Sequence, residues 1–244
     1  MLVTAAVAAV VLALACGGLL LANRSPDGSP PPPAGAEPDG DPPASTLPRA
    51  TQPPAGTDPP EEELLPPDVS LVEVAGLRLP VSESAGPARA TDGLASGFSH
   101  DRAGAVLAAA HILVRLHPQV GADVFAPTLA GQVVGPYVDA LRANLEHSYG
   151  QLLTRWPVAY GQPAGSLHFT VSGAAVDSYT DQAALVRLML EVPTDQNTVL
   201  AATGVQLRWH EDDWALVAPP DGVFSDTTIV ADASGFTLWL PGRP

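Results

Sequence analysis

Three consecutive residues, Ser99, His100 and Asp101, carry the side chains of a hydrolase triad. In such enzymes a serine hydroxyl attacks a carbonyl carbon, a histidine takes the hydroxyl proton, and a carboxylate orients the imidazole. Neighbouring residues in one turn cannot present these three groups to one another. An apolar run follows from Arg102, and Ser and Asp are preferred helix N-cap residues. We therefore predict that Ser99 or Asp101 caps a helix and that none of the three is catalytic.

The six histidines are scattered along the chain and do not have metal-ligand spacing. No H-E-x-x-H motif is present, and the pairs Glu146-His147 and His210-Glu211 have no such spacing. His111 is the one histidine within an apolar helical stretch. It could face a cavity and act as a base, but no paired carboxylate accompanies it, which favours a satisfied core residue. We predict no metal site and no catalytic residue among His100, His111, His117, His147, His168 and His210.

Two groups of acidic residues are predicted to lie in turns. Asp177 and Asp181 flank a strand and are typical of turns. The run Glu211, Asp212 and Asp213 lacks the D-x-[DN]-x-[DN]-G frame of a calcium loop and is expected to form a solvated hairpin tip. The sequence therefore predicts no catalytic, cofactor-binding or metal-binding residue and no cofactor.

Composition excludes several function classes. The 244 residues hold 11 basic residues, all of them Arg, against 26 acidic ones, which gives a formal net charge of −15. A dense basic patch for phosphates is therefore not expected, and we predict no nucleic-acid binding. The lack of Lys excludes a G-x-x-x-x-G-K-[ST] phosphate loop and Schiff-base chemistry. The single cysteine, Cys16, lies in the most apolar stretch, so the globular part has no disulfide framework.

Residues 69–244 are expected to form one α+β domain with helices before strands. A short extended piece covers residues 72–81. An apolar run over residues 102–117 predicts a buried helix, a second helix starts at Pro127, and a third runs from Pro136 to about Leu153. One stripe of the third helix is apolar, which makes it an amphipathic lid; its residues are Tyr137, Val138, Leu141, Leu145, Tyr149 and Leu152.

Alternating apolar residues predict the sheet that these helices cover. Residues 166–171 alternate, residues 184–192 form a mostly apolar run, and residues 205–209 alternate again. Trp209 and Trp214 lie on the two limbs of a predicted hairpin. After it, Phe236, Leu238 and Trp239 are expected to pack back onto the domain. The inward-facing side chains are predicted to be the apolar ones, namely Leu167, Phe169, Val171, Val205, Leu207 and Trp209.

Residues 1–22 predict a transmembrane anchor. Residues 2–22 are all Ala, Leu, Val or Gly apart from Thr4 and Cys16, and at about 1.5 Å per residue they span roughly 30 Å, the hydrocarbon thickness of a bilayer. Two alternatives remain open. Ala13-Leu14-Ala15 fits a signal-peptide cleavage site, and the same residues loosely resemble a lipobox before a lipid-modified Cys16.

Residues 23–68 predict a disordered, acidic, Pro-rich linker. Fifteen of the 27 prolines lie in these 46 residues, with nine acidic residues and two arginines. Such a chain repels itself, and at roughly 3.1 Å per residue it could reach on the order of 140 Å. Its P-x-x-P spacing could dock an SH3-like module, but a spacer role is the simpler interpretation.

The order of these segments resembles a known family. The anchor and linker are followed by Leu79-Pro80-Val81-Ser82, by Gly97-Phe98-Ser99-His100, and by the stretches 160–165 and 205–214. Together they resemble actinobacterial membrane-anchored proteins of integrative conjugative elements, over roughly residues 77–220. The resemblance implies a cystatin-like or nuclear-transport-factor-like cone, in which helices pack on a curved antiparallel sheet. It also implies similarity to the exported inner-membrane scaffold component of type IV secretion systems.

Two functions from different classes follow. The first is a non-enzymatic, single-pass, membrane-tethered assembly protein of a conjugation or secretion apparatus, with its globular domain outside the cytoplasm. Its partners would be the membrane and other secretion or conjugation components, and homo-oligomer formation stays open. The alternative is a small-molecule-binding or enzymatic member of the same fold class, whose curved sheet encloses a pocket. A cavity near His111 that contains a carboxylate would favour the alternative.

Overall fold

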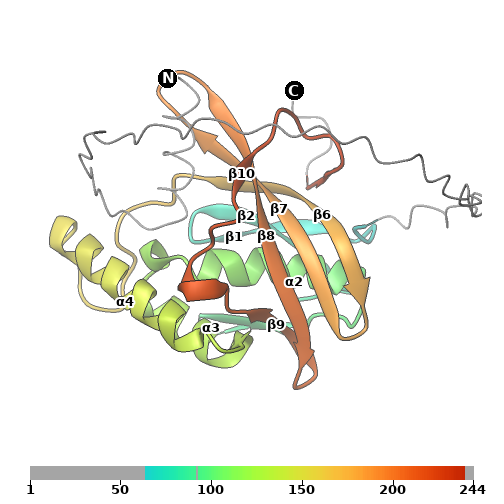
Figure 1. Ribbon diagram of the computed structural model, residues 1–244, viewed down its shortest axis with the longest axis horizontal. Helices are drawn as coiled ribbons and strands as arrows, with labels where there is room; N and C mark the ends of the chain where they lie inside the picture. Colours follow the sequence, from blue (N-terminus) through green and yellow to red (C-terminus); the bar gives the residue numbers. More distant parts are fainter. Residues whose placement is uncertain (1–63, 92, 240–244) are drawn as a thin grey trace, which may run out of the picture. The chain divides into compact units, whose positions relative to one another are not determined.

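The computed structural model describes residues 64–91 and 93–239, which form a mixed α+β domain. In this part of the chain three α-helices pack against one large curved sheet (Figure 1). The predicted anchor over residues 1–22 and all but the last residues of the predicted linker, 23–68, lie outside the described residues. No helix among the described residues has the length and hydropathy needed to cross a bilayer.

The large sheet is a long antiparallel meander with short strands at its edges. Its order is β11-β6-β7-β8-β9-β5, and β10 also pairs with β8. Only β5 pairs in parallel, with β9. The strands are β5 (Val133–Val134), β6 (Thr170–Thr180), β7 (Ala183–Pro193), β8 (Thr198–His210), β9 (Asp213–Val217), β10 (Thr228–Ile229) and β11 (Thr237–Leu238).

The alternation predicted for these strands is confirmed in part. Val205 and Leu207 are buried on the helix side, as are Phe169 and Val171. The expected strand start at Ser166 is wrong, because β6 begins at Thr170. The Ser166 carbonyl instead accepts a hydrogen bond from the Gln119 side chain. Leu167 and Trp209 are only partly buried against the core.

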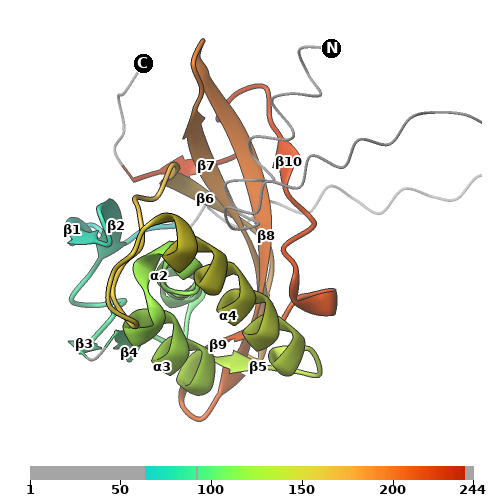
Figure 2. The ribbon, with the colours of Figure 1, turned by 90° about the vertical axis from the view of Figure 1, so that its left-hand side faces the viewer.

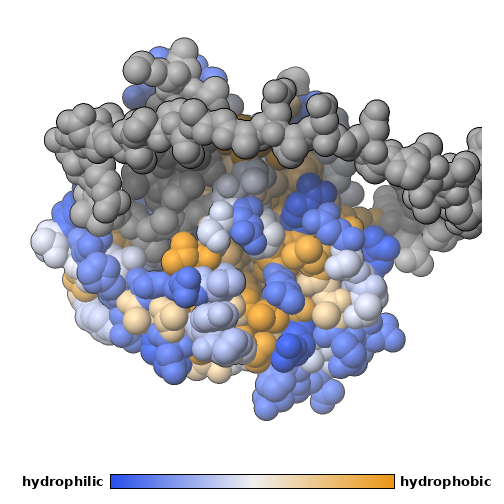
Figure 3. Space-filling model, viewed as in Figure 1, coloured by the Kyte–Doolittle hydropathy of each residue, from blue (hydrophilic) through white to orange (hydrophobic). Residues whose placement is uncertain are grey.

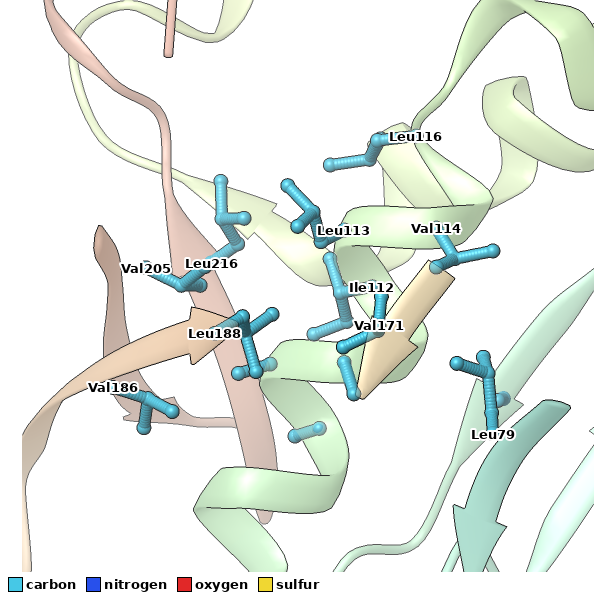
Figure 4. Close-up of a cluster of buried hydrophobic side chains, with 14 of the residues drawn as sticks. Leu79, Ile112, Leu113, Val114, Leu116, Val171, Val186, Leu188, Val205 and Leu216 are labelled. Carbon is cyan, nitrogen blue, oxygen red and sulfur yellow. The ribbon is translucent and has the colours of Figure 1, made fainter. Parts of the chain in front are cut away.

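Helix α2 (Arg102–Arg115) forms the centre of the domain. It is apolar around most of its circumference, and every residue from Gly104 to Arg115 is buried, as the composition of the run predicts. Its apolar side chains share one core with those of the sheet and with Leu79, and Val114 lies on the side of Leu79 (Figure 4). The helix ends two residues before His117, and Pro118 then begins the 3₁₀ turn η1 (Pro118–Val120).

Helix α3 (Ala122–Gln132) starts five residues before the predicted position, Pro127. Gly121, with a φ of 92°, turns the chain into this helix, and its carbonyl accepts the Phe125 N–H. Pro127 therefore lies inside the helix and forgoes only the bond to the carbonyl four residues earlier. Tertiary contacts around the first turn outweigh the preference of proline for a helix start.

Helix α4 (Val138–Arg155) covers the core beside α3 (Figure 2). Leu141, Leu145, Tyr149 and Leu152 are buried, which confirms most of the predicted stripe. Tyr137 is an exception at 39% exposure. It is the N-cap with non-helical φ and ψ, so its side chain does not continue the stripe.

Two small hairpins lie on the opposite side of the helices from the long strands (Figure 2). They are β1 (Ser70–Val74) with β2 (Leu77–Val81), and β3 (Arg89–Thr91) with β4 (Leu94–Ser96). The first confirms the predicted extended piece. Just before it, Leu65 packs into the core, and the Asp68 carboxylate accepts hydrogen bonds from Ser82 and Ser84. These bonds hold the pKa of Asp68 below its usual value.

Candidate functional site

The side chains of Ser99, His100 and Asp101 have structural partners. Asp101 is the N-cap of α2, and its carboxylate accepts the Gly104 N–H at 2.7 Å, which confirms the predicted cap. The Ser99 hydroxyl donates to the same carboxylate at 2.7 Å. The His100 ring stacks on Trp209, with ring centroids 3.7 Å apart, and bonds the Asp181 carbonyl. The His100 ring thus joins the start of α2 to the β8–β9 hairpin, whereas the Ser99 and Asp101 side chains bond locally at the start of the helix.

His111 lies in a buried polar cluster with Arg115, one helical turn later. Its Nε2 donates to the Pro80 carbonyl at 2.9 Å, and the Arg115 guanidinium donates to its Nδ1 at 2.7 Å. Burial, reinforced by the charge of Arg115, lowers the pKa of His111 to about 4, while the Pro80 carbonyl opposes this shift. Burial also lowers the pKa of Arg115 to about 10. His111 is therefore a neutral ring that joins α2 to β2, in line with the core role predicted for it.

The remaining histidines lie on separate elements. His117 is buried and caps η1 through a 3.3 Å bond from the Gln119 N–H to its Nδ1. His147 on α4 accepts the Gln151 amide at 2.9 Å. His168 is exposed, and His210 lies 3.8 Å from the exposed Glu211. Residues 64–91 and 93–239 contain no group of three or more His, Cys, Asp or Glu that could hold a metal ion.

The predicted turn carboxylates fall into two classes. Asp181 lies in the β6–β7 turn as expected. Asp177 does not, because β6 continues to Thr180. Its carboxylate instead accepts the Arg187 Nε–H with both oxygens, each at 2.8 Å, across to the neighbouring strand. Asp177 is thus a cross-strand ion-pair residue.

Asp213 is a positioning residue that the sequence pattern did not reveal. Only Glu211 and Asp212 form the hairpin turn, with φ of 49° and 63°, so the predicted three-residue tip is one residue too long. The Asp213 carboxylate accepts the backbone N–H groups of Gly97 at 2.7 Å and Phe98 at 3.1 Å. The partners are more than 110 residues apart in the chain, so local sequence carries no signal for this contact.

The candidate site is an apolar pocket of about 230 Å³ between α4, the end of α2, the start of β6, and the segment after the 3₁₀ turn η2 (Pro220–Gly222). The α4 helix and the η2 turn lie side by side in Figures 1 and 2, and apolar surface gathers on this face of the domain in Figure 3. The described residues that line the pocket are Leu113, Leu116, His117, Pro118, Leu141, Asn144, Leu145, His147, Ser148, Phe169, Gly222, Val223 and Phe224.

The pocket has an apolar floor and a polar rim. Leu113, Leu116 and Phe169 are at most 5% exposed and form part of the floor. Asn144 on the rim donates to the carbonyls of Asp221 and Gly222, at 3.0 and 3.1 Å, and so clasps the η2 segment to α4. The described lining contains no acidic side chain. This arrangement can bind a molecule with an apolar body and a polar end.

A second pocket of about 250 Å³ lies between the β1–β2 hairpin and the β6–β11 edge of the large sheet. Its lining includes Arg78, Glu191, Ser172 and Trp239. The Ser172 hydroxyl and the Trp239 indole N–H are buried and form no hydrogen bond with any residue that the structure describes. Neither pocket is lined by His111, so the buried histidine and the cavities are separate features.

Comparison with known proteins gives one family. No curated protein and no solved structure matches the chain. A family model described as a domain of unknown function, DUF8175, matches residues 28–238. This match begins within the Pro-rich segment and ends at the last residue of β11, so it takes in every helix and strand described above. The chain therefore belongs to the DUF8175 family.

Proposed function

We propose that this protein is a non-enzymatic, membrane-tethered assembly protein of a conjugation or secretion apparatus. Residues 1–22 anchor it in the cell membrane as a single pass, the part of the predicted 23–68 linker that precedes Leu64 serves as the spacer, and the domain, which includes the buried Leu65, acts outside the cytoplasm. The observation that carries the proposal is the architecture: three helices precede a long antiparallel meander. Helices packed on a curved antiparallel sheet are what the resemblance to exported type IV secretion scaffold components implies.

The domain is, in this proposal, a cystatin-like cone. The strands β6, β7 and β8 are 11, 11 and 13 residues long, and they curve around α2 (Figure 1). Long strands acquire such curvature through twist and bulges, and the β6–β7 register shifts twice, at Val171/Gly173 and Val176/Ser178. The curved sheet, whose long strands surround α2, supports this assignment.

The contacts of the ionisable side chains support a structural role. Asp101 caps a helix, Asp177 pairs with Arg187, and Asp213 holds the backbone before α2. His111 and Arg115 bond to each other. These side chains thus contribute to positioning elements of the fold.

Partner binding would fall to the surface of the domain. Tyr160 is 73% exposed in the loop after α4, and its ring contacts the Tyr149 ring edge-on at 5.6 Å. Val158 in the same loop is 43% exposed. Exposed aromatic and aliphatic side chains on a rigid support are typical of contact surfaces between proteins.

The test measures the efficiency of DNA transfer by conjugation in a host that carries the integrative conjugative element. Deleting residues 2–22 should abolish transfer, and removing half of the linker should reduce it because the linker supplies distance. His111→Ala and Asp177→Asn should leave transfer largely intact once protein abundance is normalised. Normal transfer without the anchor would refute the tether, and a loss of about a hundredfold from His111→Gln in a folded protein would refute the non-enzymatic role.

The second candidate is a small-molecule-binding member of the same fold class. The pocket beside α4 favours it, because an apolar floor with a few polar rim groups is the usual form of a ligand site. The two candidates are compatible, since a tethered assembly protein can also bind a ligand.

A further inference from the structure

The volume of the pocket beside α4 restricts what it can hold. Pockets for drug-sized ligands measure roughly 300–1,000 Å³. At about 230 Å³ this one lies below that range. It therefore suits a compact ligand, such as a fused aromatic ring system or a medium-length aliphatic chain.

The floor determines the apolar end of the ligand. Leu113 lies in the last turn of α2 and Leu116 caps that helix, whereas Leu141 and Leu145 lie on α4. Phe169 is the residue before β6. Four of the five are at most 4% exposed. A ligand that covers these side chains gains the transfer free energy of its own apolar surface.

The rim determines the polar end. The Gln151 amide donates to Nε2 of His147, so the proton of a neutral His147 ring lies on Nδ1, which can donate. Ser148, the next residue, supplies a hydroxyl donor. The described lining contains no carboxylate that would attract a cation or repel an anion, although the whole chain has a formal charge of −15. Two adjacent donors without an acid match the two oxygens of a carboxylate.

The η2 segment holds the far wall in place. Asp221 and Gly222 have positive φ, and a Cβ at Gly222 would lie 2.4 Å from the Leu141 backbone N. At position 222 the backbone therefore lies too close to α4 for any residue other than glycine. The two hydrogen bonds from the Asn144 amide hold it there. Val223 and Phe224, which follow directly, are thereby held in place as the wall of the pocket opposite α4.

From these four observations we propose that the pocket binds a small apolar monocarboxylate. The apolar body lies on the leucine floor, and the carboxylate accepts hydrogen bonds from Nδ1 of His147 and the Ser148 hydroxyl. This inference rests on the second candidate function and adds the chemical class of the ligand.

The test uses the full chain in phosphatidylcholine nanodiscs, with empty nanodiscs as the blank. The probes are 2-naphthoate, the neutral 2-naphthylmethanol and the cationic 2-naphthylmethylammonium, followed by naphthyl fluorescence anisotropy. We expect saturable binding with 2-naphthoate tightest. Ser148→Phe fills the mouth and should weaken binding at least about tenfold, whereas Ala143→Phe, exposed on the same helix and outside the lining, should not.

His147→Ala provides a second variant at an exposed position that does not threaten folding. This variant should bind 2-naphthoate about three- to tenfold more weakly, and its affinity for 2-naphthylmethanol should not change. If the alcohol or the amine binds as tightly as 2-naphthoate, the carboxylate assignment is wrong while the small-molecule site stands. If none of the three binds above the blank, or if Ser148→Phe and Ala143→Phe bind equally well, the site itself is refuted.

Discussion

His111 makes the stability of the domain depend on pH. Its pKa falls from 6.5 in the unfolded chain to about 4 in the fold, because burial and the Arg115 charge disfavour the imidazolium. A group whose pKa is lower in the folded state binds more protons when the chain is unfolded. The stabilising contribution of His111 to the unfolding free energy is therefore present above pH 6.5 and is lost as the pH falls through about 4. The shift corresponds to roughly 3 kcal/mol.

We predict that His111→Gln reduces this acid sensitivity. Glutamine keeps a donor for the Pro80 carbonyl but does not titrate. The difference in unfolding free energy between pH 7 and pH 4 should be smaller in the variant by about 3 kcal/mol. Urea unfolding followed by tryptophan fluorescence at each pH measures it. The same pH dependence in both proteins would contradict the predicted role of the neutral ring.

Asp213 gives a second prediction at the scale of one residue. Replacing it with Ala removes the acceptor of the Gly97 and Phe98 N–H groups, next to the start of α2. Leaving partly buried donors without a partner should cost about 1–3 kcal/mol of unfolding free energy. Asp195→Ala, in the exposed β7–β8 turn, is the matched control and should change stability by about 0.5 kcal/mol or less. Equal stability of the two variants would show that the Asp213 contacts add nothing.

At the scale of elements, the β8–β9 hairpin joins the sheet to the start of α2. Trp209 and Trp214 are directly paired across the strands, with rings edge-to-face at 5.3 Å. Trp214 is fully buried, and its indole N–H donates to the Ser99 carbonyl at 2.9 Å. Trp209 is half-buried under His100. The two tryptophans therefore differ in how much stability each contributes.

We predict that Trp214→Ala costs about 3–5 kcal/mol, the range for truncating a buried large aromatic residue. Trp209→Ala should cost clearly less, because part of its ring stays in contact with water. The effects should not add in the double variant, since the rings touch. Chemical unfolding of the three proteins measures these costs. A larger loss from Trp209→Ala than from Trp214→Ala would refute the ranking.

At the scale of the whole molecule, the proposed topology puts the domain outside the cytoplasm. The basis is a 21-residue apolar run followed by an acidic linker with little positive charge to oppose export. Protease added to intact protoplasts should release a fragment close in size to residues 69–244, while a cytoplasmic marker stays intact. Complete protection of the domain would overturn this orientation.

The sequence by itself determined the elements whose pattern is local. Helix α2 is apolar nearly all round and follows a side-chain cap, so the run itself predicts both its existence and its burial. The Trp209–Trp214 hairpin has alternating limbs about a polar turn, and residues 184–192 form a mostly apolar run. The α+β class and the order of helices before strands follow from these same patterns.

The tertiary structure alone decided where elements begin and which polar groups meet. Gly121 turns the chain into α3 ahead of Pro127, and the Gln119 side chain bonds the Ser166 carbonyl in the segment that precedes β6. The pair of His111 and Arg115 has i, i+4 spacing that the sequence displays, but their link to the Pro80 carbonyl, 31 residues from His111, is visible only in the fold. The pocket likewise combines side chains from four parts of the chain. Such contacts depend on how the chain closes long loops, and local propensity carries no information about that closure.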